Sequence, residues 1–329
     1  MRGRGLARVV LVAAAAGGCG GASGPAGADN GAAGMAGTGG SPASIAQVFV
    51  VAMENENIGQ IYGNSGEAPY INGTLMQFAH ATGFTDELPA DLPSEPHYVW
   101  LEAGTNAFAD HTFTTDDAPS AGNSTGSTAH LATQLTAANV SWTAYEEGID
   151  TANGGCPIAG AGFYAPKHDP FVFFLDVAGS PPSATSGPCA AHLKDLSALA
   201  GDLAAGAVAR YVFITPDLCH DMHGADGCPD SDLIHAGDTW LSETMPSLLA
   251  FASAHAAIVF LVWDEGDATG HMPFLALGPA AKPGYAGAVS YTHSSVLKTV
   301  EEILGVPLLP TVASANDLGD LLMPGALPR

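Results

Sequence analysis

Polar side chains that can bind metal ions follow three apolar runs of the sequence. The apolar runs are residues 47–53, 211–215 and 258–263. The polar side chains that come after them are Glu54, Asn55, Asp221, His223, Asp264 and Glu265. An acidic residue after a strand commonly caps the next helix or faces solvent, but carboxylates gathered at one place repel one another unless a cation lies among them. We therefore expect a cation where these side chains meet.

The chemical types of these side chains limit which ion they would hold. Oxygen ligands alone favour Ca or Mg, whereas imidazole ligands shift the preference toward transition metals. The set fits one or two divalent metal ions, and Zn, Mn, Fe, Mg and Ca all remain open.

Ser94 is a candidate nucleophile. It stands just before an apolar-rich segment that starts near Pro96 and ends at Gly104. A serine at the N-terminus of a helix lies among free backbone N–H groups, which favour an anion. A metal ion that touched its hydroxyl would lower the hydroxyl pKa and produce an attacking alkoxide. The alternative interpretation is a plain N-cap serine.

The elements that must position these residues alternate along the chain. Helical patterns lie between and after the apolar runs, at residues 130–138, 193–203, 241–254 and 294–304. Continuous apolar runs are typical of strands that are buried on both faces of a parallel sheet. Alternation with helices predicts an α/β fold, a three-layer sandwich with a mostly parallel central sheet. Ligand sites of such sheets lie beyond the carboxyl ends of the strands.

The N-terminal part of the chain differs from the rest. Basic residues precede an apolar run at 9–16, and Cys19 follows two glycines, which is the order of regions in a secretory signal. Residues 16–19 resemble a bacterial lipobox, which predicts lipidation of Cys19, and a plainly cleaved signal is the alternative. Residues 20–44 predict a flexible tether rich in Gly, Ala and Ser, and residues 45–329 predict one domain. We expect an exported protein, either a bacterial cell-envelope lipoprotein or a secreted one.

Four further cysteines are expected to form disulfides. They are Cys156, Cys189, Cys219 and Cys228. An even number in an exported protein favours disulfides over thiolate metal sites. Four cysteines permit three connectivities, of which Cys219 with Cys228 and Cys156 with Cys189 is favoured.

The charge balance excludes some partners. The chain has 9 Lys and Arg against 33 Asp and Glu, a net charge of −24. Nucleic acids and anionic membrane surfaces are bound by clustered basic side chains, so we expect neither as a partner and expect membrane contact only through an N-terminal lipid anchor. The acidic pairs at 116–117 and 146–147 are interpreted as solvated loop or helix faces.

Six segments in order resemble one known family. They read Val-Ala-Met-Glu-Asn at 51–55, Pro-Ser-Glu-Pro-His-Tyr-Val-Trp-Leu-Glu-Ala-Gly-Thr-Asn at 93–106, Tyr-Ala-Pro-Lys-His-Asp-Pro at 164–170, Pro-Asp-Leu-Cys-His-Asp-Met-His at 216–223, Trp-Asp-Glu-Gly at 263–266 and Tyr-Thr-His-Ser-Ser at 291–295. Together they look like the phosphoesterase family of bacterial phospholipases C and metal-dependent acid phosphatases, within the alkaline-phosphatase-like superfamily. The resemblance runs from about residue 47 to residue 322.

The resemblance implies roles for the matched residues. Ser94 matches the nucleophile that forms a covalent phospho-enzyme. The ligands of one metal ion match Glu54, Asn55, Asp264 and Glu265. The positions that hold a second metal ion, or contact substrate in single-metal members, match Asp221, His223 and His293. The positive pair that meets the phosphate matches Lys167 and His168.

The chain departs from the family pattern at His97. Relatives usually have Asn there, and that Asn commonly donates a hydrogen bond to a phosphate oxygen. A histidine can also donate, so His97 is expected to bind substrate with a new pH dependence. Asp217 also stands where Asn is more usual and is not counted as a ligand, and no role is assigned to His220 or His271.

The resemblance implies in-line displacement at phosphorus. Ser94 would attack a small phosphate ester, and water would then hydrolyse the phosphoserine. A phosphomonoesterase of the acid phosphatase type is favoured, because no basic or amphipathic membrane-docking stretch is evident. Two alternatives stay open: a phospholipase C that cleaves lipid headgroup diesters, and a metal-binding surface protein on an inactivated enzyme fold.

Overall fold

A mixed sheet forms the centre of the folded part of the chain. The computed structural model describes residues 44–149, 155–266 and 270–328, and their sheet has eight strands in the order β4-β3-β5-β1-β6-β7-β2-β8. The strands are β1 (Gln47–Met53), β2 (Ala79–Ala81), β3 (Trp142–Glu146), β4 (Leu193–Asp195), β5 (Tyr211–Thr215), β6 (Ala257–Trp263), β7 (Phe274–Leu277) and β8 (Ala286–Gly287).

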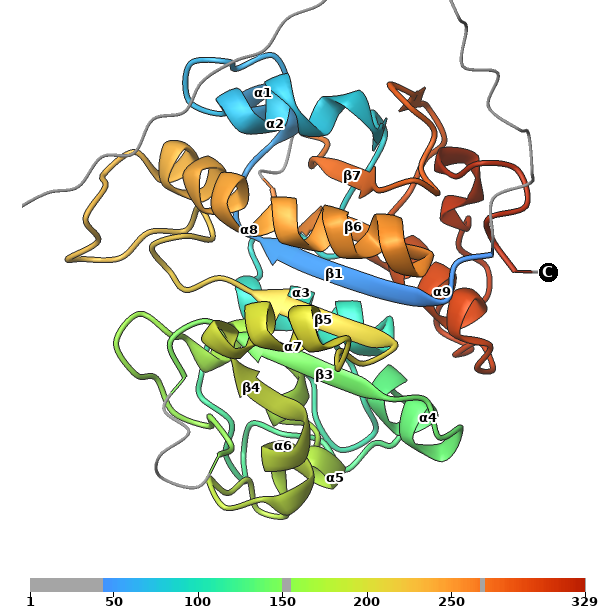
Figure 1. The fold of residues 1–329 in the computed structure, drawn as a ribbon. Helices are drawn as coiled ribbons and strands as arrows, with labels where there is room; N and C mark the ends of the chain where they lie inside the picture. The colour runs from blue at the N-terminus through green and yellow to red at the C-terminus, as the bar shows by residue number, and fades with distance from the viewer. Residues whose placement is uncertain (1–43, 150–154, 267–269, 329) are drawn as a thin grey trace, which may run out of the picture. The chain divides into compact units, whose positions relative to one another are not determined.

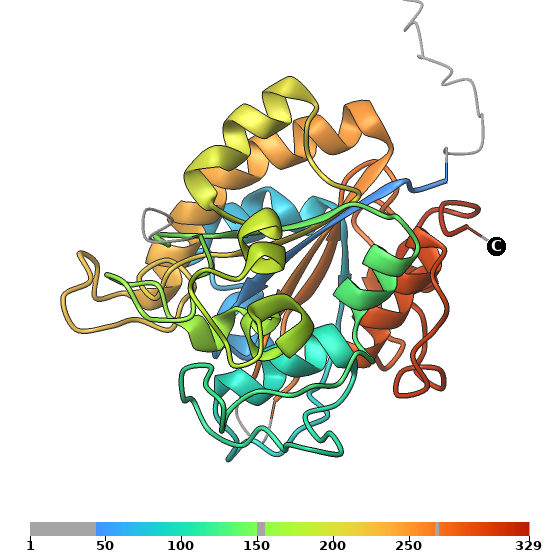
Figure 2. The ribbon, with the colours of Figure 1, turned by 90° about the horizontal axis from the view of Figure 1, so that it is seen from below.

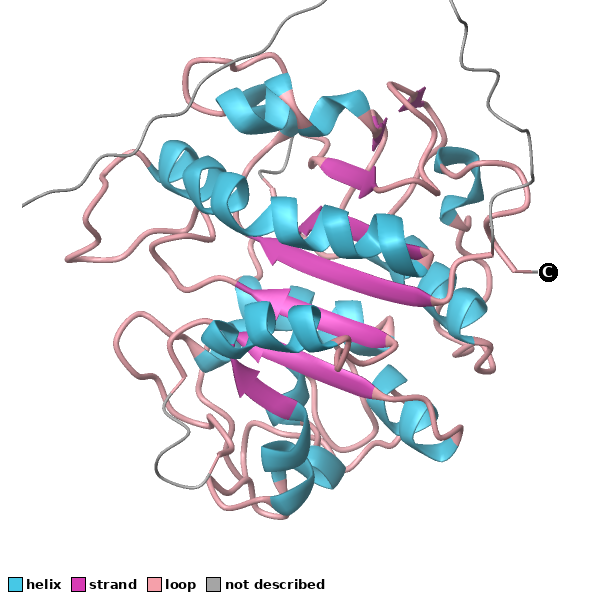
Figure 3. Cartoon of the chain, viewed as in Figure 1, coloured by secondary structure: helices cyan, strands magenta, loops and turns pink. Residues whose placement is uncertain are grey.

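The three apolar runs are the central strands. β1 pairs in parallel with β5 on one side and with β6 on the other, and β3 and β4 continue the parallel part beyond β5 (Figure 3). β7 is antiparallel to both β6 and β2. Every residue of β5 and β6 is buried, as expected for strands that are covered on both faces. The carboxyl ends of β5, β1 and β6 therefore lie side by side.

Helices cover both faces of the sheet. They are α1 (Ile58–Ile61), α2 (Pro69–Gly73), α3 (Ser94–Ala103), α4 (Leu131–Ala137), α5 (Leu175–Ala178), α6 (Gly187–His192), α7 (Leu199–Ala205), α8 (Leu233–His255) and α9 (His293–Leu304). α7 and α8 lie against one face, and α3, α4 and α9 lie against the other (Figures 1 and 2). The predicted α/β three-layer sandwich with a mostly parallel sheet is confirmed.

Two predicted helices differ from the observed ones. The segment predicted as helix 193–203 begins with β4, because buried Leu193 pairs with Ala144 of β3. The Asp195 side chain then accepts the Ser197 N–H and starts a short 3₁₀ turn before α7. The helix predicted at 241–254 is α8, which begins about two turns earlier, where the Asp232 side chain caps its N-terminus.

Two disulfides link segments around the parallel part of the sheet. Cys156 bonds to Cys189, and Cys219 bonds to Cys228, which is the connectivity that the sequence favours. The predicted signal, the lipobox with Cys19 and nearly all of the predicted tether lie outside the described residues. None of the helices in the described ranges combines the length and the apolar composition needed to cross a membrane.

Candidate active site

Backbone hydrogen bonds join the three strand ends that carry the predicted ligands. The Glu54 N–H donates to the Asp221 carbonyl over 2.8 Å, and the Asn55 N–H donates to Asp264 Oδ1 over 3.2 Å. Asn55 adopts a left-handed backbone conformation with φ of 58°, which Asn tolerates better than most residues. This conformation turns the chain away from β1 directly after Glu54. The carboxylates of Glu54, Asp221 and Asp264 are consequently held together at one edge of the sheet.

Ser94 lies at the edge of the first carboxylate cluster. Oxygens of Glu54, Asp264 and Glu265 lie within 4.8 Å of one another. The Ser94 hydroxyl donates to Glu54 Oε2 at 3.1 Å or to Glu265 Oε1 at 3.3 Å. Ser94 is the first residue of α3, and Pro93 occupies the N-cap position. The N-cap interpretation of Ser94 is therefore wrong, and its hydroxyl faces the carboxylates instead.

Buried carboxyl oxygens in this cluster lack hydrogen-bond partners. Glu54, Asp221 and Asp264 are fully buried, and each has one oxygen without a hydrogen-bond partner among the described residues. Burial first, and then repulsion between the carboxylates, raises the pKa of each of these three groups well above its usual value. Unpartnered buried oxygens of this kind fit a divalent cation, which would satisfy them and lower their pKa values again.

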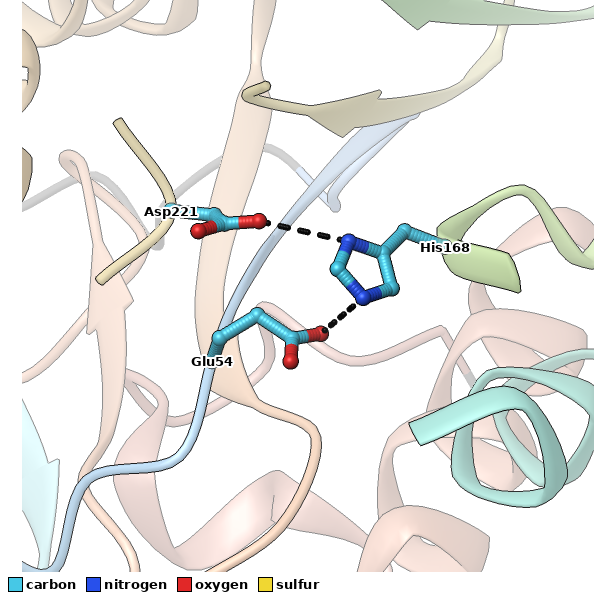
Figure 4. Close-up of side chains that lie close together, drawn as sticks. All are labelled: Glu54, His168 and Asp221. Atoms are coloured by element: carbon cyan, nitrogen blue, oxygen red, sulfur yellow. Dashed lines mark ion pairs between the residues drawn. The ribbon is translucent and has the colours of Figure 1, made fainter. Parts of the chain in front are cut away.

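His168 completes a second cluster with Glu54 and Asp221 (Figure 4). Its Nε2 lies 3.2 Å from Glu54 Oε1, and its Nδ1 lies 3.2 Å from Asp221 Oδ2. The ring stacks on the buried Tyr98 ring, with centroids 5.0 Å apart. Burial first, and then the charges of Lys167 and His223, lowers the pKa of His168 well below its usual value. A neutral imidazole between two carboxylates suits a metal ligand better than the phosphate contact that the resemblance implies.

Lys167 and His223 lie next to each other on the other side of His168. His223 Nδ1 lies 2.7 Å from the Gly224 carbonyl, so this nitrogen carries the proton. His223 Nε2 is then free to accept from the Lys167 ammonium at 3.2 Å. The His223 N–H donates to Asp221 Oδ1 over 2.7 Å, and the Cys219–Cys228 disulfide closes the loop that carries both residues. Lys167 thus places an ammonium group next to the two clusters.

His97 borders the first cluster. Its Nδ1 forms a 2.8 Å ion pair with Asp86, and its Nε2 lies 3.8 Å from Glu265 Oε2. Burial lowers the pKa of His97, but Asp86, Asp264 and Glu265 outweigh burial and raise it to about 9. The imidazole is therefore a cation beside the carboxylates, consistent with contact to an anionic substrate.

The resemblance implies that His293 joins Asp221 and His223 in one ligand set, but in the structure His293 has other neighbours. Its Nδ1 lies 3.7 Å from Asp86 Oδ1 and 3.8 Å from Glu87 Oε2, and its Nε2 bonds to the Trp263 carbonyl. In the part of the chain that the structure describes, ligand atoms of His293 cluster only with Asp86 and Glu87. The structure therefore does not bring His293 together with Asp221 and His223, and the second-metal set stays a prediction.

Several residues at the site carry no signal in the sequence. Asp86 and Asp116 come from loops, and their partners are distant in sequence: His97 lies 11 residues after Asp86, Glu95 lies 21 residues before Asp116, and Lys167 lies 51 residues after it. The prediction that residues 116–117 and 146–147 are solvated is confirmed for the exposed pair Asp116 and Asp117, although Asp116 also bonds to Lys167, and is wrong for Glu146, which is fully buried in β3. His220, which had no assigned role, pairs with Glu147 and Asp217 beside a cavity of about 670 Å³ that Ser94 does not line.

Comparison with known proteins identifies the class of the chain. It is 28% identical over 281 residues to the phosphatidylinositol-3-phosphatase of Mycobacterium tuberculosis, a match that covers 84% of this chain and 83% of the relative. It is 26% identical over 181 residues to the phosphate-repressible acid phosphatase of Penicillium chrysogenum, covering 52% and 41% of the two chains. Its fold resembles that of a phosphonate monoester hydrolase from Silicibacter pomeroyi, with a TM-score of 0.51, 13% identity, and coverage of 85% and 77%.

The fold and these relatives define a phosphoric ester hydrolase. The profile of the phosphoesterase family matches residues 73–307, a range that contains Ser94 and all the loops of the site except the one after β1. The chain therefore belongs to the phosphoesterase family.

Proposed function

We propose that the chain is a metal-dependent phosphomonoesterase in which Ser94 is the nucleophile. The observation that carries the proposal is the Ser94 hydroxyl at 3.1 Å from Glu54 and 3.3 Å from Glu265, in a cluster where Glu54 and Asp264 each keep one buried oxygen that has no hydrogen-bond partner among the described residues. A hydroxyl in that position would share a cation with the carboxylates and would ionise easily.

Two groups of side chains would hold the metal. Glu54, Asp264 and Glu265, with the amide of Asn55 and the hydroxyl of Ser94 at their edge, form the first. Glu54, His168 and Asp221 form the second. A divalent ion bound there supplies Lewis acidity, which lowers the pKa of a bound hydroxyl and neutralises phosphate charge. Zn, Mn, Fe, Mg and Ca stay open, since the ligands mix oxygen with imidazole.

The protein residues would carry out an in-line displacement in two steps. The Ser94 hydroxyl loses its proton to the carboxylate cluster and attacks phosphorus, and the ester oxygen leaves as an alcohol after taking up a proton. Water then attacks the phosphoserine and restores the Ser94 hydroxyl. Lys167 and the imidazolium of His97 would hold the phosphate oxygens and stabilise the charge that develops.

A monoester substrate is supported by the relatives. Both are named phosphatases, one of phosphatidylinositol 3-phosphate. Assays on p-nitrophenyl phosphate, phosphatidylinositol 3-phosphate and phosphatidylcholine distinguish a phosphomonoesterase from the alternative, a phospholipase C. Export is supported by the two disulfides, which persist in oxidising compartments, and lipidation at Cys19 remains a proposal that mass spectrometry of the membrane-extracted protein tests.

The test of the nucleophile is Ser94→Ala in the metal-loaded protein. We expect hydrolysis of p-nitrophenyl phosphate to fall about 10³-fold or more, and we expect the wild type to lose activity in chelator and regain it with added divalent ions. Ser186→Ala is the matched control, because Ser186 is also buried but, within the ranges that the structure describes, its hydroxyl donates only to the Val177 carbonyl. Undiminished turnover by Ser94→Ala would reject Ser94 as the nucleophile.

A further inference from the structure

The carboxylate of Asp116 bonds to two donors of the active site. Asp116 Oδ1 accepts the Glu95 N–H at 3.0 Å, and Asp116 Oδ2 accepts from Lys167 Nζ at 2.8 Å. The side chain is one-third exposed, and it comes from a loop that the chain enters after the buried Phe113. One side chain thus joins a backbone amide and an ammonium that belong to different elements.

Both donors are those that a phosphate group would need. The Glu95 N–H is the backbone amide that follows Ser94 in the first turn of α3, where an acceptor lies close to the nucleophile and the helix dipole favours an anion. Lys167 is the ammonium that faces the clusters and also contacts His223. The two oxygens of a carboxylate span such a pair of donors much as two oxygens of a phosphate would.

The charge of Asp116 also affects the pKa values of nearby groups of the site. The negative charge of Asp116 contributes to raising the pKa of Glu265 and opposes the burial that lowers the pKa of His223. Asp116 also holds the pKa of Lys167 above its usual value against the opposing effect of burial. Its carboxylate therefore lies within electrostatic reach of the first cluster and of the phosphate-binding cation.

We propose that Asp116 is an internal competitor for the phosphate subsite, occupying the Glu95 N–H and the Lys167 ammonium until substrate displaces it. This inference rests on the proposed function, because it uses the phosphate site of that reaction. Asp116 then sets the affinity of the site for phosphate monoesters and for the inorganic phosphate that they release. Displacement is easy, since a partly exposed ion pair is weak and the carboxylate can turn into solvent.

The test compares Asp116→Asn with a matched control, Asp117→Asn. An Asn at position 116 can still accept the Glu95 N–H but no longer neutralises Lys167. Asp117→Asn removes the same charge from the same exposed loop, and among the described residues Asp117 is hydrogen-bonded only through its backbone carbonyl, to Asn123. Binding of inorganic phosphate is measured by calorimetry in the metal-loaded Ser94→Ala background, and KM for p-nitrophenyl phosphate is measured with Ser94 present.

Asp116→Asn should tighten phosphate binding about fivefold and lower KM by a similar factor, which corresponds to losing one weak competing ion pair. Asp117→Asn should leave both values unchanged. Weaker or equal phosphate binding in Asp116→Asn would overturn the proposal and make Asp116 a residue that positions Lys167. Equal tightening in both variants would overturn it too, since the cause would be net charge.

Failure of this inference can be told apart from failure of the proposed function. A wild type that hydrolyses p-nitrophenyl phosphate while Asp116→Asn fails to tighten binding rejects only the role of Asp116. A wild type that neither hydrolyses the ester nor binds phosphate when loaded with divalent metal rejects both. Asp116→Ala, which removes both contacts, should tighten phosphate binding at least as much as Asp116→Asn, and a thermal melt checks that each variant is folded.

Discussion

Two histidines of this protein lie buried between two carboxylates, and their surroundings differ. His130 bonds to Glu102 Oε1 at 2.8 Å and to Asp176 Oδ1 at 3.0 Å, and its ring stacks on Phe174 with centroids 3.9 Å apart. Burial lowers the pKa of His130, but its two carboxylate partners outweigh burial and raise it to about 9. His130 is therefore an imidazolium whose two N–H groups are both used. It ties α3 to α4 and α5.

His168 also lies between two carboxylates, but it is held by them less tightly than His130 is held by its own. Its contacts to Glu54 and Asp221 are longer, at 3.2 Å each, and His168 Nε2 and the facing oxygens have no hydrogen-bond partner in the described part of the chain. Lys167 next to it further opposes a charge on the ring. A histidine between two carboxylates can therefore form a complete ion pair with them, as His130 does. It can also form, together with the carboxylates, a group of metal ligands that still lacks its cation, as His168 does.

The largest effect that separates the two histidines is expected from His168→Ala. Removing this ligand should weaken binding of the divalent ion about 100-fold and lower turnover at limiting metal accordingly. Metal content by mass spectrometry and metal titration calorimetry provide the measurement. His130→Ala serves as the control and should keep its full metal content. If His168→Ala also kept its metal content and affinity, His168 would not be a metal ligand, and the proposed difference between His168 and His130 would be rejected.

The sequence predicts the strand ends well because their signal is local. The apolar runs before Glu54 and Asp264 are long and continuous, and each polar residue follows at once, so neighbouring parallel strands had to bring them together. Asp221 does not follow its strand at once, since it lies in the loop that begins after β5 ends at Thr215. The short strands β2, β7 and β8 went unpredicted because two to four residues carry too little periodicity to be recognised.

The contacts between loops could not be predicted from the sequence. Whether Asp116 faces solvent or bonds to Lys167 depends on how a loop packs over α3, and no spacing rule encodes that distance of 51 residues. The sequence also does not report the carboxylate partners of His168 and His130: the resemblance implied a phosphate contact for His168, and His130 stood only at the start of a predicted helix. Only the partners on other elements, Glu54 and Asp221 or Glu102 and Asp176, tell them apart.

A smaller effect, on stability alone, is expected from His130→Ala. The substitution leaves the buried Glu102 carboxylate without its cation, which typically costs about 3 kcal/mol of unfolding free energy. Urea unfolding measures the loss. His192→Ala is a matched control, because His192 also stacks on an aromatic ring, Trp142, but its ring bonds to just one backbone carbonyl in the described part of the chain, so its loss should be about 1 kcal/mol. Equal losses in the two variants would show that the carboxylates around His130 add nothing.

The smallest effect concerns the pH dependence of that stability. The pKa of His130 is raised in the folded protein to about 9, above the usual histidine value of 6.5. Its contribution is thus complete below about pH 6.5 and is lost as the pH rises through about 9, where the folded imidazolium releases its proton. Burial raises the pKa of Glu102 in spite of its histidine partner, which offsets part of the gain, so we expect a difference of about 2 kcal/mol. The gap in unfolding free energy between wild type and His130→Ala should therefore narrow from about pH 6 to about pH 10. A gap that stayed constant over this range would mean that His130 is neutral in the folded protein and that it resembles His168 after all.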